Sequence, residues 1–148
     1  MAGWDADLAP EKSTSIRTHM AKNGIPLLPL RPTPQTTILL PTCNGESFLP
    51  SLLDSCLMQP AAKMIVRDDA SDDKTVEILK YYRGLCGDSI GLHLGKERLG
   101  VIKNVEFLLS LVESEYFLLA DQDDIWEKDK IVLLWEAMQK LEEQLGAD

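Results

Sequence analysis

Basic residues are scarce in this sequence, which has 15 Lys and Arg against 24 Asp and Glu and a net charge of −9. The imbalance is uneven, because residues 1–35 carry four bases and three acids while residues 36–148 carry 11 bases and 21 acids. Duplex-binding domains neutralise phosphates with a basic stripe, and the sequence contains none. We therefore expect no nucleic-acid partner.

Long apolar runs and cysteines are also few. No apolar run approaches the ~20 residues of a membrane span, and the N-terminal residues lack the basic-then-apolar pattern of a secretory signal. Cys43, Cys56 and Cys86 are odd in number and widely spaced, which excludes CxxC zinc spacing and a disulfide framework. These features favour a cytoplasmic chain without a transmembrane segment, either free or peripheral to a membrane.

The composition of the chain changes near residue 36. Residues 1–35 mix small, polar and charged side chains and contain four prolines after residue 25. Proline lacks an amide donor and restricts the residue before it, so we expect a flexible, Pro-rich N-terminal extension. Residues 36–148 are long enough for one domain with its own core.

Short apolar segments alternate with segments of helical periodicity after residue 36. Strands are predicted at residues 36–40, 64–67, 90–94 and 116–120. Helices are predicted at residues 48–57, 76–82, 101–112 and 131–145, with Ser47 and Asp73 as candidate N-caps of the first two. This α/β alternation predicts a mostly parallel sheet with helices on both faces and right-handed crossovers.

Seven of the acids form two patches, each directly after a predicted strand. The patches are Asp68, Asp69, Asp72 and Asp73, and Asp121, Asp123 and Asp124. The carboxyl ends of parallel strands share one edge, where open α/β sheets bind ligands. Converging carboxylates repel each other unless a cation, a hydrogen-bonding ligand or a raised pKa offsets the repulsion. Since Mg²⁺ or Mn²⁺ typically uses one or two carboxylates plus substrate phosphates, the pattern predicts a metal-bridged phosphate ligand.

Other motifs fit the sequence poorly. An EF-hand loop beginning at Asp121 would have Ile125 and Val132 at positions that require oxygen ligands. The sequence has no complete P-loop, no GxGxxG and no evident Ser-His-Asp set. A phosphohydrolase using Asp121 and Asp123 as nucleophile and acid stays open as an alternative, although the pair comes late in the chain for that class.

Four segments together resemble the motifs of family 2 glycosyltransferases. Residues 38–46 (ILLPTCNGE) resemble the P-T-Y-N strand, residues 65–73 (IVRDDASDD) the V-x-D-D-G-S-x-D segment, residues 99–104 (LGVIKN) the N-x-G-x-x-x-x-N block, and residues 117–126 (FLLADQDDIW) the DxD region. The D-Q-D-D-x-W form is most similar to rhamnosyltransferase-like members. The four occur in the family's order over about residues 36–138.

This resemblance implies the GT-A fold, a Rossmann-like α/β fold that binds nucleotide-diphospho-sugars. It implies inverting glycosyl transfer from a UDP- or dTDP-linked donor to a hydroxyl of a saccharide or lipid-linked acceptor, in cell-wall or polysaccharide synthesis. The cofactor would be Mg²⁺ or Mn²⁺. By matching position, Pro41, Thr42 and Asn44 would line the nucleotide pocket, Asp69 would bond the base, Lys103 would contact phosphate, Asp121 would contact the ribose or metal, and Asp123 would bind the metal.

The sequence also departs from the family pattern. Cys43 occupies the usual Tyr position, Ala70 the usual Gly position, and Arg98 a position where Asn is common. Residues 36–148 match the nucleotide-sugar-binding half of the domain, so we expect the catalytic base beyond the C-terminus of this sequence. The alternative is a truncated, non-catalytic nucleotide-sugar-binding module. Exposure of surface that an acceptor half would cover predicts self-association.

Overall fold

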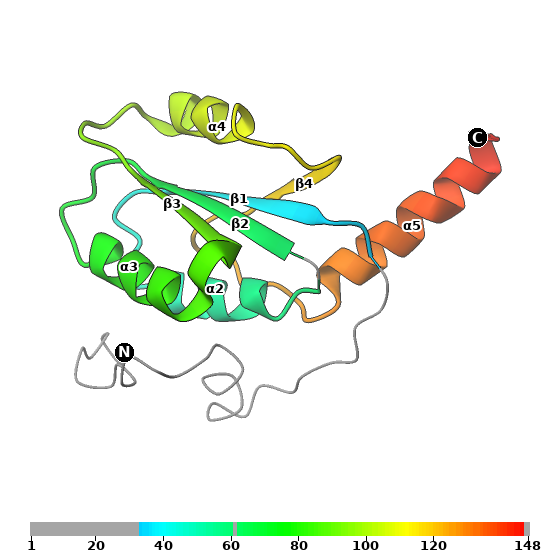
Figure 1. Cartoon of the computed structure of the whole chain (residues 1–148), viewed down its shortest axis with the longest axis horizontal. Helices are drawn as coiled ribbons and strands as arrows, with labels where there is room; N and C mark the ends of the chain where they lie inside the picture. The colour runs from blue at the N-terminus through cyan, green and yellow to red at the C-terminus, as the bar shows by residue number, and fades with distance from the viewer. Residues whose placement is uncertain (1–32, 61, 147–148) are drawn as a thin grey trace.

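The structure, a computed structural model, describes residues 33–60 and 62–146, so residues 1–32 of the predicted extension lie outside it. The described elements are β1 (Thr36–Thr42), α2 (Leu49–Leu57), β2 (Ala62–Asp68), α3 (Thr75–Cys86), the short 3₁₀ helix η2 (Gly87–Ser89), β3 (Ile90–Leu94), α4 (Val101–Leu109), β4 (Tyr116–Leu119) and α5 (Lys130–Leu145). Figure 1 shows them as a twisted sheet between helices. The predicted α/β fold is confirmed.

The four strands form one parallel sheet in the order β3-β2-β1-β4. The chain first builds the sheet outward from β1 through β2 to β3, and then crosses back to place β4 on the other side of β1. The strand order therefore reverses between β1 and β4. In open α/β sheets a crevice forms at such a switch point, beyond the carboxyl ends of the strands.

Alternate residues of β1 pack against opposite faces of the sheet. Ile38 and Leu40 belong to a large core under α2 and α3, which also contains the buried Cys56 of α2. Leu39 belongs to a small core under α4 with Ile65. Figure 1 shows α2 and α3 on one face and α4 on the other. Because every residue from Thr36 to Leu40 is buried, β1 is the apolar centre of both layers.

The two predicted N-caps differ in outcome. Ser47 was the wrong residue, because α2 begins after Phe48, and the Phe48 and Leu49 N–H groups donate to the Gly45 carbonyl at 3.0 Å. Pro50 fits near this start because the first N–H groups of a helix have no intrahelical acceptor. The Asp73 carboxylate does accept the Thr75 N–H at 2.9 Å, so it satisfies a first-turn donor of α3.

The helices after β3 are less buried than their apolar spacing predicts. In α4 the buried residues are Asn104 and Leu108, while Val101 is 71% exposed. In α5 only Ile131 and Val132 are buried, and the helix extends away from the sheet (Figure 1). The core under α4 is small, with Leu39, Ile65 and Leu108 as its buried residues, so it encloses few apolar positions of this helix. Among the described residues, no helix has both the length and the apolarity needed to cross a bilayer.

Candidate functional site

A cleft of about 290 Å³ lies at the carboxyl ends of β1 and β4, at the switch point of the sheet. Its walls include five of the residues predicted from the sequence: Pro41, Thr42, Asp69, Asp121 and Asp123. The N-terminal part of α4 contributes Val101 and Asn104 to the opposite wall. The structure thus brings together residues up to 82 positions apart in the sequence around one hollow.

Two predicted site residues lie elsewhere. The Asn44 side chain accepts the Asp72 N–H at 3.0 Å, and its own N–H donates to Ser71 Oγ at 2.8 Å. Asn44 therefore joins the loop after β1 to the loop after β2 beside the cleft. Lys103 is exposed on α4 and borders a separate shallow hollow with Glu106. Their proposed contacts with a nucleotide stay predictions.

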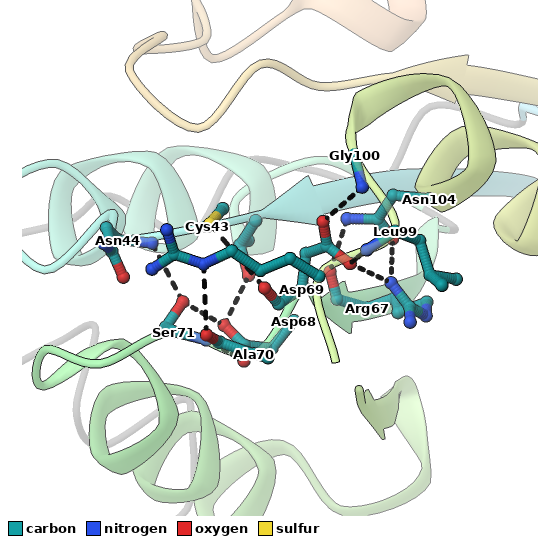
Figure 2. Close-up of polar contacts among 12 residues, drawn as sticks. Cys43, Asn44, Arg67, Asp68, Asp69, Ala70, Ser71, Leu99, Gly100 and Asn104 are labelled. Atoms are coloured by element: carbon teal, nitrogen blue, oxygen red, sulfur yellow. Dashed lines mark hydrogen bonds and ion pairs between the residues drawn. The ribbon is translucent and has the colours of Figure 1, made fainter. Parts of the chain in front are cut away.

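Asp69 is buried at the end of β2 and accepts three hydrogen bonds within the protein. The Leu99 N–H donates to Oδ1 and the Gly100 N–H to Oδ2, each at 2.8 Å, and the Arg67 guanidinium pairs with Oδ1 at 2.8 Å. Figure 2 shows the carboxylate between the guanidinium and the start of α4. The sequence predicted Asp69 as a ligand contact, but it did not predict this bridging role.

The hydrogen bonds on Asp69 favour its ionised form. Burial raises the pKa of this carboxyl, but the bonds from the Leu99 N–H, the Arg67 guanidinium and the Gly100 N–H outweigh burial and hold the pKa below its ordinary value. An ionised carboxylate only accepts hydrogen bonds. Any ligand atom that meets Asp69 in the cleft must therefore donate.

Arg67 and Asn104 are site-supporting residues that sequence reasoning missed. Arg67 Nη1 donates to Asn104 Oδ1 at 3.1 Å, and the Asn104 amide donates to the Arg67 carbonyl at 3.3 Å. Both side chains are buried between β2 and α4. The available signal was an arginine within a strand otherwise predicted to be buried, since buried charges need a partner.

Asp68 has a structural role beside the cleft. Its carboxylate accepts the Thr42 hydroxyl at 3.3 Å and the Ser71 N–H at 2.9 Å. These bonds hold a tight turn in which Ala70 has a φ of 55°, the left-handed region that favours glycine. The resembled motif usually has glycine at this position. Here Ala70, which carries a Cβ, adopts the left-handed conformation instead.

Gln122 attaches the DxD segment to β1. Its Oε1 accepts the Cys43 N–H at 3.0 Å and its Nε2 donates to the Cys43 carbonyl at 3.1 Å. A Cβ on Gly45 would lie 2.8 Å from Gln122 Oε1, so this approach requires glycine there. The middle residue of the DxD segment faces the protein, and the segment bends through an Asp124 N–H bond to the Asp121 carbonyl.

Asp121 and Asp123 are both exposed and both border the cleft. No group of three or more His, Cys, Asp or Glu side chains suited to a metal ion occurs within the described ranges. Two carboxylates that line this cleft nevertheless match a cation whose other ligands would come from substrate and water. Burial raises the pKa of the neighbouring Cys43 thiol, which argues against a thiolate nucleophile in the cleft.

Comparison with known proteins now identifies the family. Residues 37–145 match the family described as glycosyl transferase family 2. The chain belongs to this family. Its fold is that of GT-A glycosyltransferases, and membership in this family gives no support to the phosphohydrolase hypothesis.

Three curated relatives of this family 2 chain are similar over 100 residues each. They are the putative teichuronic acid biosynthesis glycosyltransferase TuaG of Bacillus subtilis (29% identical), the poly(ribitol-phosphate) beta-N-acetylglucosaminyltransferase TarS of Staphylococcus aureus (30%) and the dTDP-rhamnosyl transferase RfbG of Shigella flexneri (31%). The matches cover 66%, 64% and 61% of this chain. They cover only 39%, 17% and 33% of the respective relatives, so the chain spans a minor part of each.

Two solved structures share the fold. The S. aureus TarS 1–349 complex with UDP-GlcNAc has a TM-score of 0.65 at 24% identity, over 72% of this chain and 31% of that chain. The mannosyltransferase PcManGT of Pyrobaculum calidifontis, in complex with GDP-Man and Mn²⁺, has a TM-score of 0.61 at 23% identity, over 75% and 35%. At these identities the likeness concerns the fold.

Proposed function

We propose that this chain is the donor-binding part of an inverting glycosyltransferase that takes a nucleotide-diphospho-sugar together with Mg²⁺ or Mn²⁺. The observation that carries the proposal is the cleft at the β1–β4 switch point, which gathers Asp69, Asp121 and Asp123. The solved relatives in complex with UDP-GlcNAc and with GDP-Man and Mn²⁺ support the same ligand class. The complete reaction requires an acceptor site in addition.

Asp121 and Asp123 fit a divalent cation that is shared with a diphosphate. They are exposed and negatively charged, and they follow the edge strand β4, where the ligand crevice opens. When bound, such a cation neutralises negative charge on the nucleotide-diphosphate leaving group. The contribution of the chain is to hold both carboxylates at the cleft through the Gln122 bonds to Cys43.

The Asp69 carboxylate is suited to accept a hydrogen bond from a nucleobase that carries a ring N–H. The ionised carboxylate only accepts hydrogen bonds, and uracil and thymine present an N–H on the pairing edge. Guanine also presents a ring N–H, so the preference for a UDP- or dTDP-linked donor rests in addition on the TarS complex with UDP-GlcNAc and on the description of RfbG. RfbG is described as a dTDP-rhamnosyl transferase, so rhamnosyl transfer is the more specific form of the proposal, with other hexosyl transfer as its alternative.

Donor binding is tested by calorimetry on the chain with Mn²⁺ present. We expect UDP and dTDP to bind, and we expect Asp123→Ala to remove the metal dependence. Asp88→Ala is a suitable control because this exposed acid of η2 is remote from β4 and forms only a surface pair with Arg83. Absence of heat with both nucleotides, or an unaffected Asp123→Ala variant, would overturn the proposal.

A second candidate function is nucleotide-sugar binding without turnover. The observation behind this candidate is that the chain spans at most 39% of the three relatives. A transfer assay separates the candidates, because only the enzyme releases nucleotide diphosphate faster when a saccharide or lipid-linked acceptor is added. Donor binding with no acceptor-dependent release favours the binding module.

We also propose self-association and a cytoplasmic location, free or peripheral to a membrane. Phe117 and Leu119 of β4 are 47% and 46% exposed, and Leu141 and Leu145 of α5 are 55% and 78% exposed. One edge of β4 carries no partner strand within the described sheet. The three free cysteines support a reducing compartment.

A further inference from the structure

Arg67 is a charged residue inside a strand whose last five positions, Met64 to Asp68, are all buried. Its side chain is 7% exposed and that of Asp69 is 5% exposed. Removing a guanidinium from water costs several kcal/mol unless close partners compensate. Arg67 has three: the Asp69 carboxylate at 2.8 Å, Asn104 Oδ1 at 3.1 Å, and the Phe107 ring, whose centroid lies 5.3 Å from the guanidinium carbon.

The chain after β3 lies so close to this guanidinium that position 95 has no space for a residue larger than glycine. A Cβ on Gly95 would lie 2.8 Å from Arg67 Nη2 and 2.7 Å from the Asp68 carbonyl oxygen. The Gly95 N–H donates to that same carbonyl at 2.8 Å, so the chain leaving β3 closes over the end of β2. The Arg67 guanidinium is therefore enclosed between the sheet and α4 by specific contacts.

The network of Arg67 leads directly to the cleft. Asp69 binds the Leu99 and Gly100 N–H groups, which are the last residues before α4, and Asn104 lies one turn into the same helix. Asp69 and Asn104 both line the cleft, whereas Arg67 does not. Figure 2 shows the guanidinium joined by dashed lines to the Asp69 carboxylate and to Asn104.

We propose that Arg67 is a positioning residue for donor binding, which fixes Asp69 and Asn104 so that the start of α4 is held as a wall of the cleft. The inference rests on the proposed function. Two of the Asp69 bonds come from the backbone N–H groups of the two residues directly before α4, so the carboxylate and the start of the helix are oriented together. The Nη1 atom donates to both Asp69 and Asn104 while the planar guanidinium lies over the Phe107 ring, a combination that the compact, strongly hydrated ammonium of lysine reproduces only in part.

The test compares Arg67→Met and Arg67→Lys with Arg83→Met, a control whose guanidinium forms a surface pair with Asp88 on the α3 side of the sheet. Three quantities are measured: the Kd for UDP with Mn²⁺, the unfolding free energy in urea, and the amide hydrogen-exchange rates of Leu99 and Gly100. We expect Arg67→Met to weaken UDP binding about tenfold and to raise both exchange rates at least tenfold. Arg67→Lys should be intermediate, and Arg83→Met should match the wild type.

A purely structural role predicts a different result. It would lower the unfolding free energy of Arg67→Met while leaving the Kd of the folded molecules and the two exchange rates unchanged, and that outcome overturns the proposal. Weaker binding with unchanged exchange overturns it as well, because the effect would not pass through α4. If Arg67→Met does not fold, Arg67→Lys and Asn104→Ala carry the same comparison. If the wild type does not bind UDP, the proposed function fails, while the exchange rates still decide whether Arg67 orders α4.

Discussion

Ala70 has a backbone conformation that suits glycine better than alanine. Its φ of 55° lies in the left-handed region, where a Cβ crowds the backbone and costs roughly 1–2 kcal/mol. Glycine removes this strain but gains freedom in the unfolded chain, which offsets part of the benefit. We expect Ala70→Gly to raise the unfolding free energy by about 0.5–1 kcal/mol, as measured by urea denaturation.

The matched control is Ala137→Gly at an exposed position inside α5. There glycine lacks the steric advantage and should lower stability or leave it unchanged. A destabilised Ala70→Gly protein would contradict the prediction, because it would show that the added freedom of the unfolded chain outweighs the relief of strain at φ 55°.

Gln122 holds the DxD segment in place at the cleft through its contacts with the Cys43 backbone. Gln122→Ala removes both bonds to the Cys43 backbone and leaves those groups without a side-chain partner. We expect a loss of about 1–2 kcal/mol in unfolding free energy and about tenfold weaker Mn²⁺-dependent binding of UDP, because Asp121 and Asp123 lose their attachment to β1. Calorimetry and urea denaturation measure the two effects.

Gln139→Ala on the exposed surface of α5 serves as the control and should change neither quantity. Unchanged UDP affinity in Gln122→Ala would mean that the position of the DxD segment does not depend on Cys43.

The residues that line the cleft were largely predictable, and those that support it were not. Pro41, Asp69 and Asp123 follow predicted strands, so strand order alone places them at one edge. The Gln122 bonds join residues 79 positions apart, and Arg67 reaches Asn104 across 37 positions. Such contacts depend on how strands and helices face each other, which periodicity along the chain does not contain.

At the scale of elements, the start of α3 depends on an ionised carboxylate. Burial raises the pKa of Asp73, but bonds from the Thr75 hydroxyl and N–H and from the Glu46 N–H outweigh it, so the pKa lies below its ordinary value. Asp69 has the same direction of shift at the start of α4. Both helices therefore begin on carboxylates that are more acidic in the folded protein than in the unfolded chain.

This arrangement makes stability depend on acid pH. A lowered folded-state pKa stabilises the protein above the unfolded value of about 3.9, and the contribution disappears as pH falls through the folded-state pKa. We expect the unfolding free energy to be level from about pH 5 to 7 and to fall below about pH 4. Asp69→Asn and Asp73→Asn should each lower stability at pH 7 and flatten the acid slope, as urea titrations at several pH values would measure.

Asp88→Asn is the control for this pH series, because Asp88 is exposed and its ion pair with Arg83 lies at the surface. An acid slope that persists in the double variant Asp69→Asn, Asp73→Asn would place the titrating groups elsewhere in the chain.

Most strand bounds were predicted well. β1 and β3 begin at the predicted residues, and β3 also ends there. The apolar face predicted for α4 was partly wrong, since Val101 and Leu109 are exposed and Asn104 is buried. From the sequence alone, a polar residue such as Asn104 is expected at the surface of a helix. Asn104 is buried because its side chain pairs with the buried Arg67.

At the scale of the whole molecule, most of the exposed large apolar side chains in the described part of the chain belong to α4, β4 and α5, and those of β4 and α5 adjoin an open strand edge. An open strand edge and a protruding amphipathic helix are sites where copies of a chain associate. We expect light scattering to give a mass above the 16.5 kDa of one chain. The double variant Phe117→Lys, Leu134→Lys should return the mass toward that of one chain, since both side chains border the apolar groove between β4 and α5.

Glu77→Lys on the exposed side of α3 alters charge without touching this surface and should leave the association unchanged. A clean 16.5 kDa monomer for the wild type would contradict the self-association proposal.

The buried Cys56 makes it possible to measure how often the large core of this molecule opens. Cys56 is 1% exposed in the large core, and burial raises its pKa to about 12 and that of Cys86 to about 11. At pH 8 the Cys56 thiol of the folded protein therefore stays in the protonated form, which is the unreactive one. An alkylating reagent would therefore modify Cys56 only in molecules whose α2 layer has separated from the sheet, and the labelling rate would count those separations without any introduced probe.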